Sequence, residues 1–186
     1  MTLDFQSPAL NDEQIAALVR LLGGPDEVRR MLSGDTGIAQ FATIPGSLSF
    51  EERVARGSYG WRHPDLTEAS FPLAGLDADD DAHDDRREVE QKLFHFNRNV
   101  SSEDAAQLIV EAGFEPAAIA DILAFGEAAP HVQCRHPVVG LGSVATIEGK
   151  ASAPTLWFDG TRRTLDVLWL DGDWHRNYRF LGVRRI

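Results

Sequence analysis

The sequence has one cysteine, Cys134, in 186 residues. A single thiol excludes an internal disulfide framework and is typical of a protein that folds in a reducing compartment. No stretch of the chain approaches the roughly eighteen apolar residues that a membrane-spanning helix requires, so we expect no membrane partner. The N-terminal residues Met1 to Gln6 lack the basic and apolar regions of a signal peptide. These absences predict a soluble, cytoplasmic protein.

Lysine is also scarce, because Lys92 and Lys150 are the two lysines and arginine supplies the other basic residues. Acidic residues exceed basic ones by 29 to 18, which gives a net charge of -11. Contacts with nucleic-acid phosphates need clustered cations. The acidic balance therefore argues against a nucleic-acid partner.

Residues 1–60 predict a helical segment. Apolar spacing predicts one helix from Asn11 or Asp12 to Leu22 and a second from Pro25 to Gly34, which together form a helical hairpin. A DNA-reading helix-turn-helix is the alternative, and the acidic residues at the start of the second helix disfavour it. Ser49 and Glu52 have the spacing of a capping box, which predicts a third, short helix.

Residues 61–91 predict an acidic, irregular linker. Residues 77–90 contain eight acidic residues against Arg86 and Arg87, a block too charged to bury. The alternative is a calcium loop of the EF-hand type, whose positions 1, 3, 5, 7, 9 and 12 would be Asp77, Asp79, Asp81, His83, Asp85 and Glu88. Ala82 stands where that loop needs a glycine, so the solvated linker is the favoured interpretation.

Residues 92–186 predict an α+β domain. We expect a strand over residues 93–100, a helix from Ser101 or Ser102 to Gly113, and a helix from Pro116 to Gly126. A C-terminal antiparallel β-meander follows, with strands over residues 138–147, 155–158, 164–170 and 174–185. Its hairpin turns are predicted at Asp159-Gly160 and Asp171-Gly172. Alternation places Leu165, Val167 and Trp169 on one face, and we expect Trp169 to point inward.

Three stretches of the sequence carry a resemblance. They are the helical pattern from Ile15 to Gly34, the segment from Val100 to Phe114, and the aromatic and arginine-bearing tail from Trp174 to Arg185. Together they resemble a group of small uncharacterised bacterial proteins. That group has no assigned activity, so the resemblance implies neither a reaction nor a cofactor.

One short segment carries residues that could bind a metal. His131, Cys134 and His136 are all acceptable zinc ligands, and His175 could supply a fourth. The alternative is a half-buried Cys134 among surface histidines. The sequence has no nucleophile elbow, no phosphate loop and no His-Glu-x-x-His motif, so we predict no catalytic residue.

Aromatic and arginine residues gather near the C-terminal strands. Both types are enriched at binding hot spots. The alternative is that the tryptophans fill a thin core and the arginines cover its wet face. The candidate partner-binding residues are Trp157, Arg162, Arg163, Trp174, Arg176, Tyr178 and Arg179.

The favoured function is therefore a non-catalytic, intracellular protein-interaction module that uses this aromatic and arginine-bearing sheet surface and needs no cofactor. The runner-up is a metal-dependent enzyme or metal-binding protein. The partner and the oligomeric state stay open.

Overall fold

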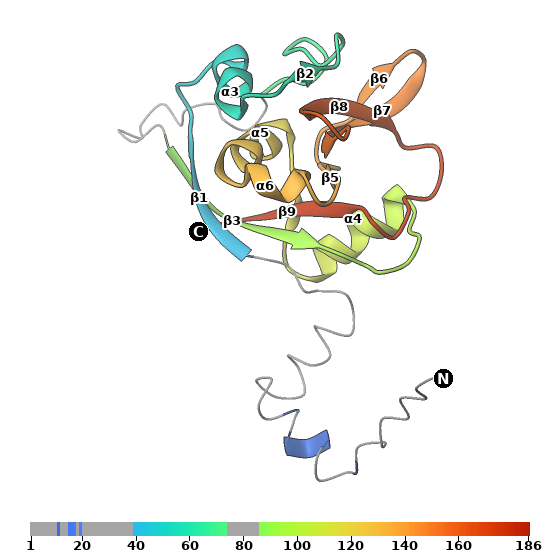
Figure 1. Cartoon of the computed structure of the whole chain (residues 1–186). Coiled ribbons are helices and arrows are strands. Elements are labelled where there is room, and N and C mark those ends of the chain that lie inside the picture. Colours follow the sequence, from blue (N-terminus) through green and yellow to red (C-terminus); the bar gives the residue numbers. More distant parts are fainter. Residues whose placement is uncertain (1–10, 12–14, 18, 20–38, 74–85) are drawn as a thin grey trace, which may run out of the picture.

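The computed structural model describes residues 11, 15–17, 19, 39–73 and 86–186 (Figure 1). Residues 15–17 and 19 are helical, Asn11 is not, and the rest of the predicted helical hairpin lies outside the described residues. The elements are β1 (Ala39–Pro45), α3 (Phe50–Gly57), β2 (Trp61–Arg62), β3 (Arg86–Phe94), α4 (Ser102–Glu111), β4 (Glu115–Pro116), α5 (Ile119–Ala128), α6 (Pro130–Gln133), β5 (Val138–Val139), β6 (Ala145–Ile147), β7 (Lys150–Phe158), β8 (Arg163–Trp169) and β9 (Arg179–Arg185).

The described strands form one mixed sheet of nine strands, so the coarse prediction of a mixed helix and strand fold is confirmed. The strand order is β1-β3-β9-β5-β7-β8-β2, with β4 beside β9 and β6 beside β7. β7 and β8 form the hairpin predicted around Asp159-Gly160. β9 does not pair with β8. It lies between β3 and β5, antiparallel to the first and parallel to the second.

The predicted meander is thus wrong after β8. Alternation along a strand determines which face a side chain occupies, but it does not determine the neighbouring strand. After β8 the chain first forms an isolated antiparallel bridge between Trp174 and Val100. This bridge leads the chain away from β8 and toward β3.

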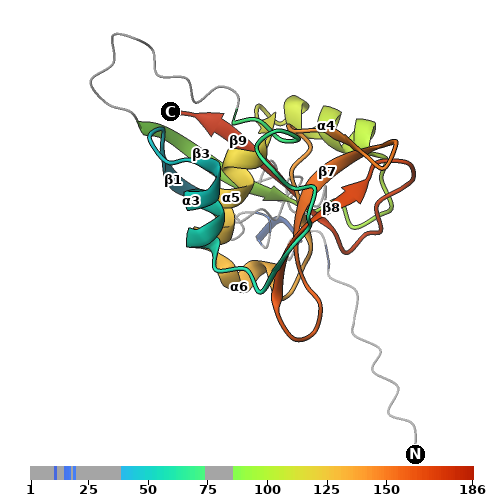
Figure 2. The ribbon, with the colours of Figure 1, turned by 90° about the horizontal axis from the view of Figure 1, so that it is seen from above.

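Helices cover both faces of the sheet. Neighbouring residues of a strand point to opposite faces, and Leu93 and Phe94 of β3 accordingly belong to two separate apolar clusters. Leu93 packs in the cluster of Ile122 from α5, and Phe94 packs in the cluster of Ile109 from α4. Figures 1 and 2 show α3, α5 and α6 together, with α4 on the other side of β3 and β9.

Local capping signals position the helices. The Ser49 and Glu52 capping box at the start of α3 is confirmed, because the Ser49 hydroxyl accepts from the Glu52 N–H and the Glu52 carboxylate accepts from the Ser49 N–H. Ser101 caps α4 as predicted. Pro116 does not start a helix: it lies in β4, and α5 begins at Ile119. The Asp121 carboxylate caps α5 by accepting from the Ala118 N–H.

The segment predicted as linker contributes to the fold at both of its ends. Leu66 and Phe71 are fully buried in the core cluster that contains Leu93. β3 begins at Arg86, seven residues before the predicted strand, and residues 95–99 are irregular. β1 pairs with β3 from Ala39 to Pro45, so residues 39–73 share the sheet and core of residues 86–186. Among the described residues, no helix is long and apolar enough to cross a membrane.

Candidate binding pocket

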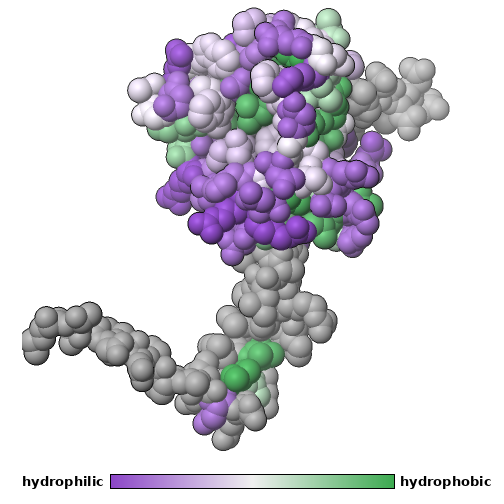
Figure 3. All heavy atoms as spheres, turned by 90° about the vertical axis from the view of Figure 1, so that its right-hand side faces the viewer, coloured by the Kyte–Doolittle hydropathy of each residue, from purple (hydrophilic) through white to green (hydrophobic). Residues whose placement is uncertain are grey.

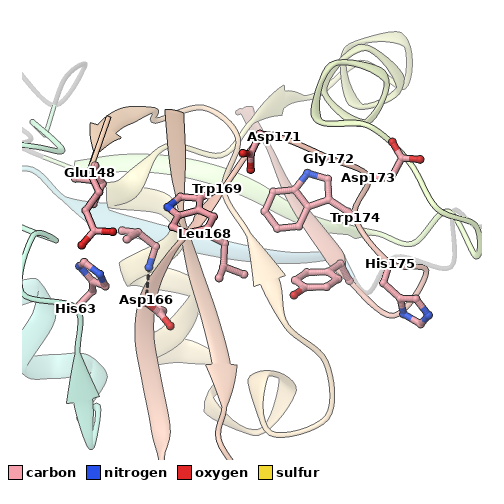
Figure 4. A pocket seen from close by; sticks show the side chains of 13 residues that line it. His63, Glu148, Asp166, Leu168, Trp169, Asp171, Gly172, Asp173, Trp174 and His175 are labelled. Carbon is pink, nitrogen blue, oxygen red and sulfur yellow. Dashed lines mark hydrogen bonds between the residues drawn. The ribbon is translucent and has the colours of Figure 1, made fainter. Parts of the chain in front are cut away.

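A pocket with a volume of about 520 Å³ lies beside the second half of β8, between the β6–β7 turn and the loop that follows β8. Three kinds of side chain dominate its lining. They are four carboxylates (Glu148, Asp166, Asp171 and Asp173), three aromatic rings (Trp169, Trp174 and Tyr178) and two imidazoles (His63 and His175). Figure 4 shows His63 and Glu148 pointing toward one another at one end, with Asp173 and His175 at the other.

The β6–β7 turn places Glu148 at the pocket. Ile147 pairs with Lys150 across the turn, which leaves Glu148 and Gly149 as its two central residues. Both have a positive φ, 51° and 79°, as a type I′ hairpin turn requires. The turn thus fixes the positions of Glu148 and of Lys150, the first residue of β7.

Lys150 reaches across to the end of β8. Its Nζ lies 3.7 Å from the centroid of the Trp169 ring and 2.9 Å from Asp171 Oδ2. Trp169 is 50% exposed. The prediction that Trp169 points inward is therefore wrong: Leu165 and Val167, on the same face of β8, are buried in the core, whereas Trp169 lies at the end of the strand with an ammonium against its ring.

Asp166 is held in place by two hydrogen bonds. Its Oδ2 accepts from Trp157 Nε1 at 3.1 Å, and its Oδ1 accepts from the Val167 N–H at 2.8 Å. Burial raises the pKa of Tyr178, and the negative charge of Asp166 raises it further. Tyr178 therefore keeps its proton at neutral pH and offers the pocket a neutral hydroxyl.

Trp174 anchors the loop that closes the other end of the pocket. It is 5% exposed, and its Nε1 donates to Ser102 Oγ at 2.8 Å. Its backbone exchanges hydrogen bonds with Val100. The indole meets Tyr178 and Phe180 edge to face, with centroids 5.1 Å and 5.9 Å away. This packing fixes the loop from Asp171 to Tyr178 against α4.

His63 contributes from the segment between β2 and the next turn. Its Nδ1 accepts from the Asp65 N–H at 3.2 Å. The ring also meets Trp61 edge to face. His63 is therefore an oriented imidazole at the edge of the pocket.

The predicted partner-binding residues separate into different places. Trp174 and Tyr178 line the pocket, and Trp157 borders it through Asp166. No arginine lines the pocket. Arg163 is half-buried and donates to Gly57 O and Gln133 Oε1, and Arg162 pairs with Asp159. The pocket lining therefore includes two of the predicted aromatic residues and none of the predicted arginines.

The sequence does not predict that the acidic residues of the pocket and His63 form a site. The sequence predicts Asp171 as part of a hairpin turn, whereas Glu148 and Asp173 belong to no motif. Their grouping depends on the β6–β7 turn and on the bridge between Trp174 and Val100, which no local pattern indicates.

The predicted metal ligands do not converge. His131 and His136 line a second cavity with His95, whereas His175 lines the first pocket. Cys134 is exposed and follows α6, where its thiol donates to the Pro130 carbonyl. Within the described ranges no group of three or more histidine, cysteine, aspartate or glutamate residues could hold a metal ion. The segment begins as the short helix α6, so Cys134 and His136 do not share a face as they would in a strand.

Most of the predicted calcium loop lies outside the described residues: Asp77, Asp79, Asp81, His83 and Asp85. Its last position, Glu88, lies in β3, where its carboxylate accepts from the Thr43 hydroxyl.

Comparison with known proteins yielded no match to any family model, and no significant match to a curated protein or to a solved structure.

Proposed function

We propose that the protein is a non-catalytic interaction module whose acidic, aromatic pocket receives the basic side chain of a partner protein. The observation that carries this proposal is the position of Lys150. Its ammonium lies against the Trp169 ring and pairs with Asp171, so the molecule already uses this combination of groups to hold a cation.

Carboxylates remain in the pocket for a second cation. Asp171 is engaged by Lys150, and both oxygens of Asp166 accept hydrogen bonds. The side chains of Glu148 and Asp173 form no hydrogen bond or ion pair with another described residue. Glu148 at one end of the pocket and Asp173 at the other are therefore the two carboxylates that remain available to pair with an incoming cation.

Arginine is the side chain that suits the pocket best. Its guanidinium is planar, stacks on aromatic rings and can donate two parallel hydrogen bonds to one carboxylate. The volume of about 520 Å³ suits a long side chain and part of its backbone. The net charge of -11 would also attract a basic partner over longer distances at low salt. This proposal retains the aromatic residues of the predicted interaction surface. It assigns the charged contacts to carboxylates and not to the predicted arginines.

The face in Figure 3 is mostly hydrophilic, with small, separated apolar areas. A large continuous apolar patch is the usual sign of a hydrophobic docking surface. Recognition through charge and aromatic contacts agrees better with this face than hydrophobic docking does.

The test is a titration with two blocked tripeptides, Gly-Arg-Gly and its citrulline counterpart, followed by tryptophan fluorescence. Citrulline has the shape of arginine without the charge. We expect saturable binding of the arginine peptide and none of the citrulline peptide. Equal responses to both peptides, or no response to arginine at low salt, would contradict the proposal.

A further inference from the structure

A second cavity, of about 200 Å³, shares no lining residue with the acidic pocket. Every polar side chain that lines it is basic: His95, His131, Arg135, His136 and Arg179. These side chains come from the residue directly after β3, from α6 and the turn after it, and from the start of β9. The fold thus gathers basic residues from three separate segments around one hollow.

The described residues supply no negative charge to this cavity. No described carboxylate lines it, and Arg179 forms no ion pair with another described residue. Its Nη1 instead donates to the carbonyl oxygens of Asn177 and Tyr178. Half-burying a guanidinium without a counter-ion is costly, which is why burial lowers the pKa of Arg179.

The positive charge of Arg179 also affects the pKa values of two histidines in the cavity. Burial lowers the pKa of both His95 and His136, and the charge of Arg179 lowers both further. His95 is also oriented, because its Nε2 lies 3.0 Å from the Arg176 carbonyl oxygen and donates to it. An anion in the cavity would relieve the repulsion among these groups.

We propose that this cavity binds a phosphate group. Two guanidinium groups, those of Arg135 and Arg179, line the cavity from different segments, and their charge and number of N–H donors suit the several oxygens and the double charge of phosphate better than a planar, singly charged carboxylate. The volume admits a tetrahedral oxyanion together with the atom that carries it. The phosphate could be inorganic or part of a phosphomonoester, and both present the same oxygens to the cavity.

The test is isothermal titration calorimetry of the full chain at neutral pH and low salt with inorganic phosphate, O-phosphoserine and acetate. We expect binding of inorganic phosphate, of O-phosphoserine or of both, and the tighter ligand identifies the source. Arg179→Met and Arg135→Ala should each weaken that binding about tenfold or more, because each removes a charge-assisted contact.

The matched control is Arg176→Ala, which removes an exposed positive charge close to the cavity but outside its lining. It should change the affinity by no more than about twofold, because exposed charges are screened. Arg135 is exposed, so its variant stays informative if Arg179→Met lowers stability. The proposal is overturned if neither phosphate ligand binds, if acetate binds as tightly as they do, or if Arg176→Ala weakens binding as much as Arg179→Met.

Discussion

Lys150 Nζ lies 3.7 Å from the centroid of the Trp169 ring, and the same ammonium pairs with Asp171. This contact ties the start of β7 to the end of β8 at the rim of the acidic pocket. It occupies one aromatic face and one carboxylate that an incoming basic side chain would otherwise meet. Lys150 is therefore expected to compete with the ligand that we propose.

Replacement of Lys150 by methionine tests this competition. The change frees Asp171 and the face of Trp169 and makes the pocket more negative, so the arginine tripeptide should bind more tightly than to the wild type. Stability should change by less than about 1 kcal/mol, because the ion pair is exposed. Peptide titration and urea unfolding measure the two effects. Weaker peptide binding to the variant would show that Lys150 supports the site instead of blocking it.

The tryptophans should differ sharply in their contribution to stability. Trp174→Ala should cost roughly 3 to 5 kcal/mol, because the indole is buried and its removal leaves a cavity beside Phe180. Trp169→Ala should cost less than about 1 kcal/mol, since this ring is half exposed at a strand end. Chemical denaturation of both variants makes the comparison. Similar losses would contradict the account of how the loop after β8 is anchored.

The buried ion pair between Arg87 and Asp121 should contribute more to the free energy of unfolding than an exposed ion pair does. The Asp121 side chain is 2% exposed, and its carboxylate also caps α5 at Ala118. Asp121→Ala should cost about 3 to 5 kcal/mol, because it leaves Arg87 half-buried without its partner. The control, Asp171→Ala, removes an exposed partner and should cost less than about 1 kcal/mol. Equal losses in urea unfolding would refute this ranking.

The capping box of α3 predicts a pH dependence. Hydrogen bonds from the Ser49 hydroxyl and N–H lower the pKa of Glu52 below its usual range. A carboxyl group whose pKa is lower in the folded state stabilises the fold above its unfolded pKa, and the stabilisation is lost as the pH falls through the folded value. Glu52→Gln should therefore be less stable than the wild type near neutral pH, and the difference should shrink in acid. A difference that stays constant down to about pH 3 would exclude this contribution.

Local signals in the sequence predicted the local parts of the fold. Ser49 and Ser101 cap α3 and α4 because a capping hydroxyl acts on a backbone N–H only a few residues away. Asp159 likewise closes the β7–β8 hairpin, where its carboxylate accepts from the Thr161 and Arg162 N–H groups. Such interactions need no distant partner, so the sequence pattern is sufficient to predict them.

The parts of the fold that the sequence did not predict correctly depend on contacts between residues far apart in the chain. The place of β9 between β3 and β5 is determined by burial on two faces, where Phe180 and Leu181 enter separate clusters. The candidate pocket joins Glu148 to residues after β8, and the second cavity joins His95 to Arg179. The spacing of residues along the chain does not predict these contacts, because they form only when the sheet is assembled.

The central claim is that the acidic pocket binds a basic side chain through its unpaired carboxylates. Its most direct test is calorimetric titration of the arginine tripeptide into two double variants that lose the same charge. One is Glu148→Gln with Asp173→Asn in the pocket, and the other is Glu103→Gln with Glu111→Gln on the exposed surface of α4. The account predicts that the pocket variant loses about tenfold or more in affinity while the α4 variant stays within about twofold of the wild type. Equal affinities for the two variants would contradict it.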